Sequence, residues 1–238
     1  MSYSQEQPLQ IGVLLCGVVQ LLDLAVIDLF AILHPDYLAK CDVSQSVLDQ
    51  AVPSTIRYIG ESSSAELTGS ITMNITDHVS SESVAPGNLD ILLIPGPDPS
   101  EVPSDEILNF VRAHHEFGTT IITICTGSQV AAYAGILDGK QAAGPWKLLP
   151  ILRERFPEVK WNDTHRYVRE DNIWCSGKYR LLKALLFPRP KLTTTCEAGI
   201  ANGLDTVIAY MRTNFAPPVV DEVCGLAEVA DRHVEFAA

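Results

Sequence analysis

Cys125 is the residue of this chain best placed to do chemistry. It follows the β-branched run Thr119 to Ile124, which is typical of a buried strand, and it precedes Gly127 and an alanine-rich stretch that favours a helix. A sharp strand-to-helix turn lifts the corner residue toward the free N–H groups of the helix start, which favour a thiolate. We therefore predict a cysteine nucleophile elbow, analogous to the serine elbow of α/β-hydrolases. The alternative is a small buried residue that ends a strand.

Asp23 is the second candidate, because it and Asp28 are the only charged residues in the apolar segment from Leu21 to Leu33, which is predicted to be a helix. The predicted strand Leu9 to Leu15 precedes it, so Asp23 would stand at the carboxyl end of the first strand, where doubly wound sheets bind ligands. A capping acid in the first helical turn is the alternative. Another predicted strand, Leu89 to Ile94, ends at a proline-rich loop in which Gly96 is free to expose its N–H to a ligand.

The elements that must position these residues alternate between strand and helix along the chain. Further strands are predicted at Ser54 to Glu61, Ile71 to Val79, Trp161 to Arg169 and Asn172 to Cys175. Further helices are predicted from a Ser104 cap to Glu116, and at Trp146 to Phe156, Ile200 to Arg212 and Val219 to Asp231. Asp36 to Pro53 and Ser80 to Asn88 are interpreted as connections, and His114 and His115 as surface residues. This order predicts an α/β three-layer sandwich with a mostly parallel sheet.

Composition limits the classes of function. A chain of 238 residues with 47% hydrophobic residues suits one domain over residues 1–238. Its net charge of −12 argues against nucleic acid and anionic membranes as partners. The polar N-terminus, the lack of a membrane-length apolar stretch and six scattered cysteines without a Cys-x-x-Cys pair lead us to expect a cytoplasmic protein without a metal site.

Several short motifs, in this order, resemble the ThiJ/PfpI (DJ/PfpI) superfamily, which has the class I glutamine amidotransferase-like fold and a flavodoxin-like sheet. The similarity extends from about Ile11 to Met211. The motifs are Leu22-Asp23, Ile94-Pro95-Gly96, Ile124-Cys125-Thr126-Gly127, the run from Ala134 to Lys140, the run from Arg155 to Val159, and the run from Asn172 to Gly177. The most similar branch is the isonitrile hydratase-like group, in which Cys-Thr-Gly and Leu-Asp both occur.

This resemblance implies a homodimer that acts on a small molecule without any cofactor. Cys125 would attack the terminal carbon of an isocyanide to give a thioimidate, and Asp23 would hold water and move protons. Backbone N–H groups of Thr126 and of the Gly96 loop would stabilise developing negative charge. Water would then release an N-substituted formamide. Two alternatives stay open: glyoxalase-type or deglycase-type chemistry on reactive aldehydes, and a non-enzymatic thiol that senses oxidants or ligands.

The chain departs from the superfamily pattern in its loops. Pro97 stands where relatives often have a second glycine, and it has no N–H to donate. Gly144-Pro145-Trp146 stands where many relatives have Thr-His-Trp, so we expect no Cys-His-Glu triad and a structural role for His165. A regulatory subtype carries an added DNA-binding domain, and the sequence after Met211 is too short and too acidic to suggest one here.

The segment from Lys178 to Ala198 is an atypical insertion between two motifs that adjoin each other in relatives. It carries the basic residues Lys178, Arg180, Lys183, Arg189 and Lys191 and a single acid, Glu197. Two explanations are open: a retained intron in the gene model, or a basic surface loop near the active-site rim.

Overall fold

The computed structural model describes residues 7–177 and 200–230, so the predicted insertion at 178–198 lies outside the described residues. Its centre is a seven-stranded sheet of order β10-β11-β7-β6-β1-β2-β5. The strands are β1 (Leu9–Leu14), β2 (Ser54–Gly60), β5 (Asp77–His78), β6 (Ile91–Ile94), β7 (Thr120–Thr123), β10 (Tyr167–Glu170) and β11 (Ile173–Ser176). Neighbouring strands are parallel except for β10 and β11, which confirms the mostly parallel sheet.

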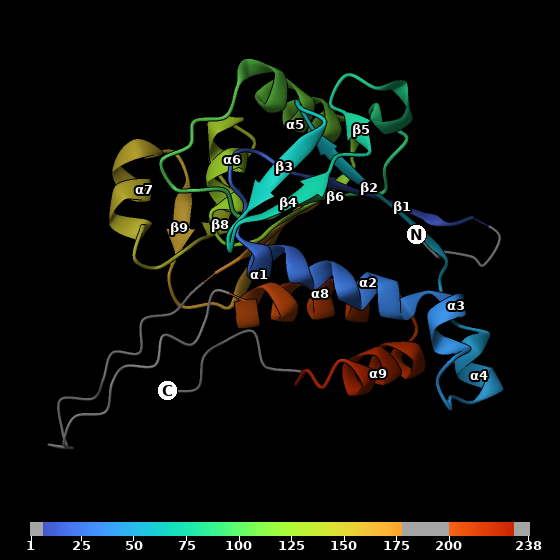
Figure 1. Ribbon diagram of the computed structural model, residues 1–238. Helices are drawn as coiled ribbons and strands as arrows, with labels where there is room; N and C mark the ends of the chain where they lie inside the picture. Colours follow the sequence, from blue (N-terminus) through green and yellow to red (C-terminus); the bar gives the residue numbers. More distant parts are fainter. Residues whose placement is uncertain (1–6, 178–199, 231–238) are drawn as a thin grey trace, which may run out of the picture.

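Helices cover both faces of this sheet (Figure 1). One face carries α1 (Leu21–Leu24), the 3-10 turn η1 (Ala25–Ile27), α2 (Asp28–Leu33), α8 (Ile200–Asn214) and α9 (Pro217–Leu226). The other carries α5 (Asp105–Phe117), α6 (Gly127–Tyr133) and α7 (Leu149–Arg155). Each layer has its own apolar core, and β6 is buried along its whole length because both of its faces are covered. The predicted three-layer sandwich is confirmed.

Two small sheets lie outside the central one. β3 (Ser64–Leu67) and β4 (Ile71–Asn74) form an antiparallel hairpin, and β8 (Gln141–Ala143) pairs with β9 (Lys160–Asn162) in parallel. The sequence pattern does not predict β3, and it predicts β4 and β5 as one strand from Ile71 to Val79. Gly69 and Ser70 both have positive φ angles and turn the chain back on itself, which the polar composition of this region did not reveal.

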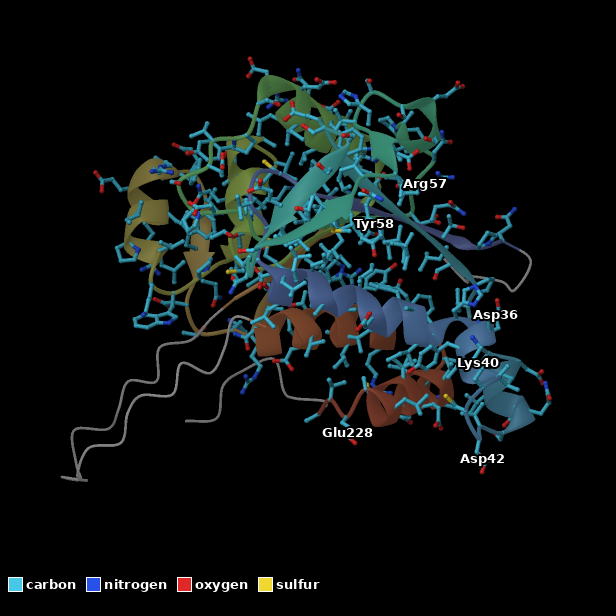
Figure 2. All side chains as sticks on the ribbon, viewed as in Figure 1. Asp36, Lys40, Asp42, Arg57, Tyr58 and Glu228 are labelled. Carbon is cyan, nitrogen blue, oxygen red and sulfur yellow. The ribbon has the colours of Figure 1, made fainter. Side chains whose placement is uncertain are left out.

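The segment from Asp36 to Pro53, expected to be irregular, contains two short helices. They are α3 (Pro35–Leu38) and α4 (Gln45–Leu48), and a third short element, the 3-10 turn η2 (Glu82–Val84), lies in the other predicted connection. Pro35 occupies the first turn of α3, and the His34 side chain accepts the Asp36 N–H as its cap. Figure 2 shows Asp36, Lys40 and Asp42 at this end of the molecule, beyond the end of α2 that is remote from α1.

Helix α5 begins as predicted but buries a histidine that we expected on the surface. The Ser104 hydroxyl accepts the Ile107 N–H at 3.2 Å and caps the helix. His114 is fully buried: its Nε2 lies 3.0 Å from the Val84 carbonyl oxygen, and its Nδ1 lies 3.1 Å from the Thr119 hydroxyl. Burial lowers the pKa of His114. His114 lies two turns after Ile107 on the same buried face of α5, and this position determines its burial more than any attraction to the helix dipole does.

Candidate functional site

The strand order brings the predicted site residues to one edge of the sheet. Strands β1, β6 and β7 are neighbours, and the order of the strands across the sheet reverses at β1. Asp23 follows β1, Gly96 follows β6 and Cys125 follows β7. Parallel strands have their carboxyl ends at the same edge, and such reversal points are where open α/β sheets form ligand crevices.

Cys125 occupies a strained turn between β7 and α6. Its φ angle is 55°, the left-handed region that non-glycine residues rarely adopt. Its N–H donates to the Ser176 hydroxyl at 2.8 Å, and its carbonyl oxygen accepts the Ser128 hydroxyl at 2.9 Å. A side chain at Gly127 would clash with the Ile94 carbonyl, so only glycine fits where the helix begins. The strand-to-helix elbow predicted from the sequence is therefore present.

Gly96 lies against both Asp23 and Thr126. A side chain added at Gly96 would collide with the Asp23 carboxylate and with the Thr126 hydroxyl. The Thr126 hydroxyl donates to the Pro97 carbonyl oxygen at 2.6 Å, which ties the start of α6 to the loop after β6. Pro97 therefore contributes an acceptor to the site, although it cannot contribute a donor.

Asp23 is completely buried, and neither of its carboxylate oxygens has a hydrogen-bond partner of ordinary geometry among the described residues. Burial raises the pKa of Asp23 to about 6, while interactions with the Cys125 thiol and the Gly96 N–H act in the opposite direction. A group with this pKa holds or releases a proton near neutral pH. The capping role considered for Asp23 is not supported by any side-chain hydrogen bond at the start of α1.

The Cys125 thiol does not ionise as easily as the sequence led us to expect. Burial raises the pKa of Cys125 to about 12, and the negative charge of Asp23 adds to the effect. The Thr126 N–H favours the thiolate but is outweighed. The prediction relied on the helix start alone and overlooked the acid that the fold places beside the sulfur. At neutral pH the site therefore pairs a protonated thiol with a carboxyl group that is mostly ionised and that titrates about one pH unit lower.

Ser176 is the site residue that the sequence analysis missed. It ends β11, is 2% exposed and binds the Cys125 N–H. A hydroxyl at the end of an otherwise apolar strand, beside the strand that leads to the nucleophile, was the available signal. His165 forms contacts within its own turn, where its Nδ1 lies 2.9 Å from the Asn162 side-chain oxygen. Cys16 and Cys175 are buried, as expected of core residues.

Within residues 7–177 and 200–230, no three or more His, Cys, Asp or Glu side chains gather closely enough to hold a metal ion. In the same ranges, no helix has the length and apolar character needed to cross a membrane.

Comparison with known proteins decides the family. The profile of the DJ-1/PfpI family matches residues 38–188, which is more than half of the chain. The chain belongs to the DJ-1/PfpI family. The matched range includes Gly96, Cys125 and Thr126 and begins after Asp23. The superfamily predicted from the motifs is thereby confirmed, and the isonitrile hydratase-like branch stays a prediction.

Individual relatives include regulators. The HTH-type transcriptional regulator GbdR of Pseudomonas aeruginosa is 37% identical over 54 residues, which is 23% of this chain and 15% of that protein. An AraC family transcriptional regulator from Pseudomonas putida aligns with a TM-score of 0.67 and 11% identity, over 92% of this chain and 100% of that structure. DJ-1beta of Drosophila melanogaster aligns with a TM-score of 0.66 and 13% identity, over 94% and 100%. At these identities the two structures establish the fold alone.

The sequence similarity to GbdR corrects one expectation. From the net charge of −12 we excluded a nucleic-acid partner, and that exclusion is wrong because a relative of this chain is an HTH-type transcriptional regulator. The net charge counted for one domain is a property of that domain's surface alone. A domain that senses a ligand within a regulator does not have to contact the nucleic acid itself, so an acidic surface is compatible with a regulatory role.

Proposed function

We propose that this chain is a ligand-sensing domain that binds a small molecule at Asp23 and Cys125. The observation that carries the proposal is the buried Asp23 carboxylate, whose two oxygens have no hydrogen-bond partner of ordinary geometry among the described residues, although the Cys125 thiol and the Gly96 N–H interact with it. Leaving such a group unpaired costs about 1–3 kcal/mol or more, and a ligand that donates a hydrogen bond removes this cost. The similarity to a transcriptional regulator supports a sensing role.

The site chemistry favours ligand binding over oxidation as the sensed event. Oxidation of cysteine proceeds through the thiolate, and the pKa of Cys125, raised to about 12, keeps the thiol protonated at neutral pH. The Asp23 carboxylate accepts hydrogen bonds, so a ligand that pairs with it needs a donor, and we take this donor to be the N–H of a neutral amide or of an ammonium group. We therefore propose a neutral or cationic small molecule whose nitrogen faces Asp23.

Thermal unfolding with acetamide and methylammonium as probes tests this proposal. Binding to the folded state raises the Tm, so both the native chain and Asp28→Asn should respond to at least one probe. Asp28 is the matched control because it lies in the same segment with an exposed side chain. Asp23→Asn should show no response. An equal response in Asp23→Asn, or none in the native chain, would count against the proposal.

The contact between Cys125 and Asp23 favours a second candidate, hydration of an isocyanide. The first step adds sulfur and hydrogen to the same terminal carbon, which a protonated thiol beside a titrating carboxyl group supplies. The product R–N=CH–S–Cys125 then takes up water and releases R–NH–CHO together with the free thiol. Asp23 would move the protons in both steps, so atoms and charges balance without a cofactor.

Incubation with cyclohexyl isocyanide separates the two candidates. A hydratase forms N-cyclohexylformamide in many equivalents per chain, measured by mass spectrometry, and Cys125→Ala abolishes the product. Asp23→Asn should slow turnover by about a hundredfold or more, the usual contribution of a general acid–base group. A chain that binds probes but forms no formamide is a sensor alone.

A further inference from the structure

The backbone of Cys125 needs support from outside its own turn. A left-handed φ of 55° is less favourable for an L-residue than the right-handed region. Such a conformation persists only where neighbouring groups hold it. Within the elbow, the Ser128 hydroxyl holds the Cys125 carbonyl oxygen. The Cys125 N–H is held from another strand.

That outside contact comes from β11. Strand β11 runs parallel to β7 with Cys175 opposite Thr123, so its last residue, Ser176, lies level with the end of β7. The Ser176 hydroxyl oxygen accepts the Cys125 N–H at 2.8 Å, and the Ser176 side chain is 2% exposed. A regular strand residue at position 125 would direct its N–H to a backbone carbonyl. The left-handed turn redirects that N–H to a side chain.

We infer that Ser176 is a positioning residue, which fixes the Cys125 backbone so that the sulfur faces Asp23. Without the hydroxyl, a buried N–H loses its partner and the left-handed conformation loses its support. Cys125 then relaxes to negative φ. Because the direction of Cβ from the backbone depends on φ, the sulfur moves away from Asp23. The inference rests on the proposed function only in taking Cys125 as the working residue of the site.

Alkylation of Cys125 by iodoacetamide, followed by peptide mass spectrometry, measures the contact between the thiol and Asp23. The Asp23 charge opposes thiolate formation, so Asp23→Asn should speed alkylation at pH 8 about tenfold, the effect of lowering the thiol pKa by one. In a Ser176→Ala background the same Asp23→Asn change should alter the rate by less than about threefold, because the coupling between the two side chains is lost. Ser176→Thr keeps a hydroxyl and should restore the full effect.

Thr119→Val is the matched control for loss of a buried hydroxyl. Thr119 is 4% exposed, bonds the Leu89 carbonyl and precedes β7 at the edge remote from Cys125. The tenfold effect of Asp23→Asn should survive in this background. Survival of the effect in a folded Ser176→Ala chain would overturn the inference. Alkylation needs no ligand, so this result is independent of whether any probe binds.

Hydrogen exchange on the native chain keeps the inference testable if Ser176→Ala does not fold. The Cys125 amide should exchange as slowly as the amides of β7, because it is bound to a buried hydroxyl. Exchange at the rate of a solvent-exposed loop amide would show that the bond to Ser176 does not hold the backbone.

Discussion

Asp23 and Cys125 constrain each other's ionisation. Burial raises the pKa of both, the negative charge of Asp23 raises the pKa of Cys125 further, and the hydrogen bond from the Cys125 thiol lowers the pKa of Asp23. The pair is therefore more stable with one bound proton than with none, and its two groups titrate as a coupled unit. This coupling distinguishes the site from a thiolate activated only by a helix start, and it follows from a contact between residues far apart in the chain.

The raised pKa of Asp23 makes a prediction for stability. A carboxyl group with a folded-state pKa of about 6, above its ordinary 3.8, contributes stability that is fully present below pH 3.8. That stability is lost as pH rises through 6, by up to about 3 kcal/mol. Asp23→Asn removes the buried charge, so its advantage in the free energy of unfolding over the native chain should grow between pH 4 and pH 8. Urea unfolding across this range measures it.

Asp28→Asn serves as the control, because Asp28 lies in the same segment and its side chain is exposed. If the difference in the free energy of unfolding between the native chain and Asp23→Asn does not change with pH, the Asp23 carboxyl group ionises as it does in water.

The elbow depends on how closely α6 approaches β6. The Ile94 carbonyl accepts the Ile124 N–H at 2.9 Å, and Gly127 passes directly over that same carbonyl. The sequence run from Ile124 to Gly127 therefore supplies the Cys125 thiol and, two residues later, a glycine whose lack of a side chain lets α6 approach β6. Closeness of backbones, rather than helix propensity, explains glycine at the first position of α6.

Gly127→Ala should destabilise the protein by about 2–3 kcal/mol or more, because the added carbon meets a backbone oxygen that cannot move aside. Gly225→Ala is the matched change, since Gly225 lies in α9 with open space around it. There alanine should be neutral or stabilise the helix by up to about 1 kcal/mol. Thermal unfolding compares the two variants. Equal Tm values would contradict the tight approach of α6 to β6.

For the molecule as a whole, the described parts of the chain on either side of residues 178–199 meet each other. The Asn202 side chain, fully buried in α8, donates a hydrogen bond to the Gly177 carbonyl. Arg166 also approaches Asn202 and forms an ion pair with Asp205 at 3.7 Å. Helix α8 therefore packs on the end of β11 regardless of the chain that connects them.

Deletion of residues 178–198, which joins Gly177 to Gly199, should therefore preserve the fold. A shorter connection also has a smaller loop-closure entropy, although this effect is weak. The Tm should change by no more than a few degrees, and the effect of Asp23→Asn on Cys125 alkylation should remain. Replacing 178–198 by a flexible glycine–serine linker of equal length controls for the loss of length. Failure of both chains to fold would show that the segment is part of the domain.

Local sequence patterns determined much of this protein. The β-branched and apolar runs fixed the positions of β1, β6, β7 and β11, because strands buried on both faces need little besides such runs. The glycine and cysteine spacing after those strands predicted the elbow. The alternation of strands and helices predicted the parallel sheet, whose topology in turn brought Asp23, Gly96 and Cys125 to one edge.

Tertiary structure decided what depends on distant neighbours. The upward shift of the Cys125 pKa results from burial and from the charge of Asp23, and neither is visible in the residues around position 125. His114 is buried because α5 turns that face toward η2 and the loop before β7. Ser176 matters because β11 pairs with β7. Sequence patterns report a residue's own helix or strand, whereas ionisation, burial and backbone support are set by side chains that only the folded chain brings together.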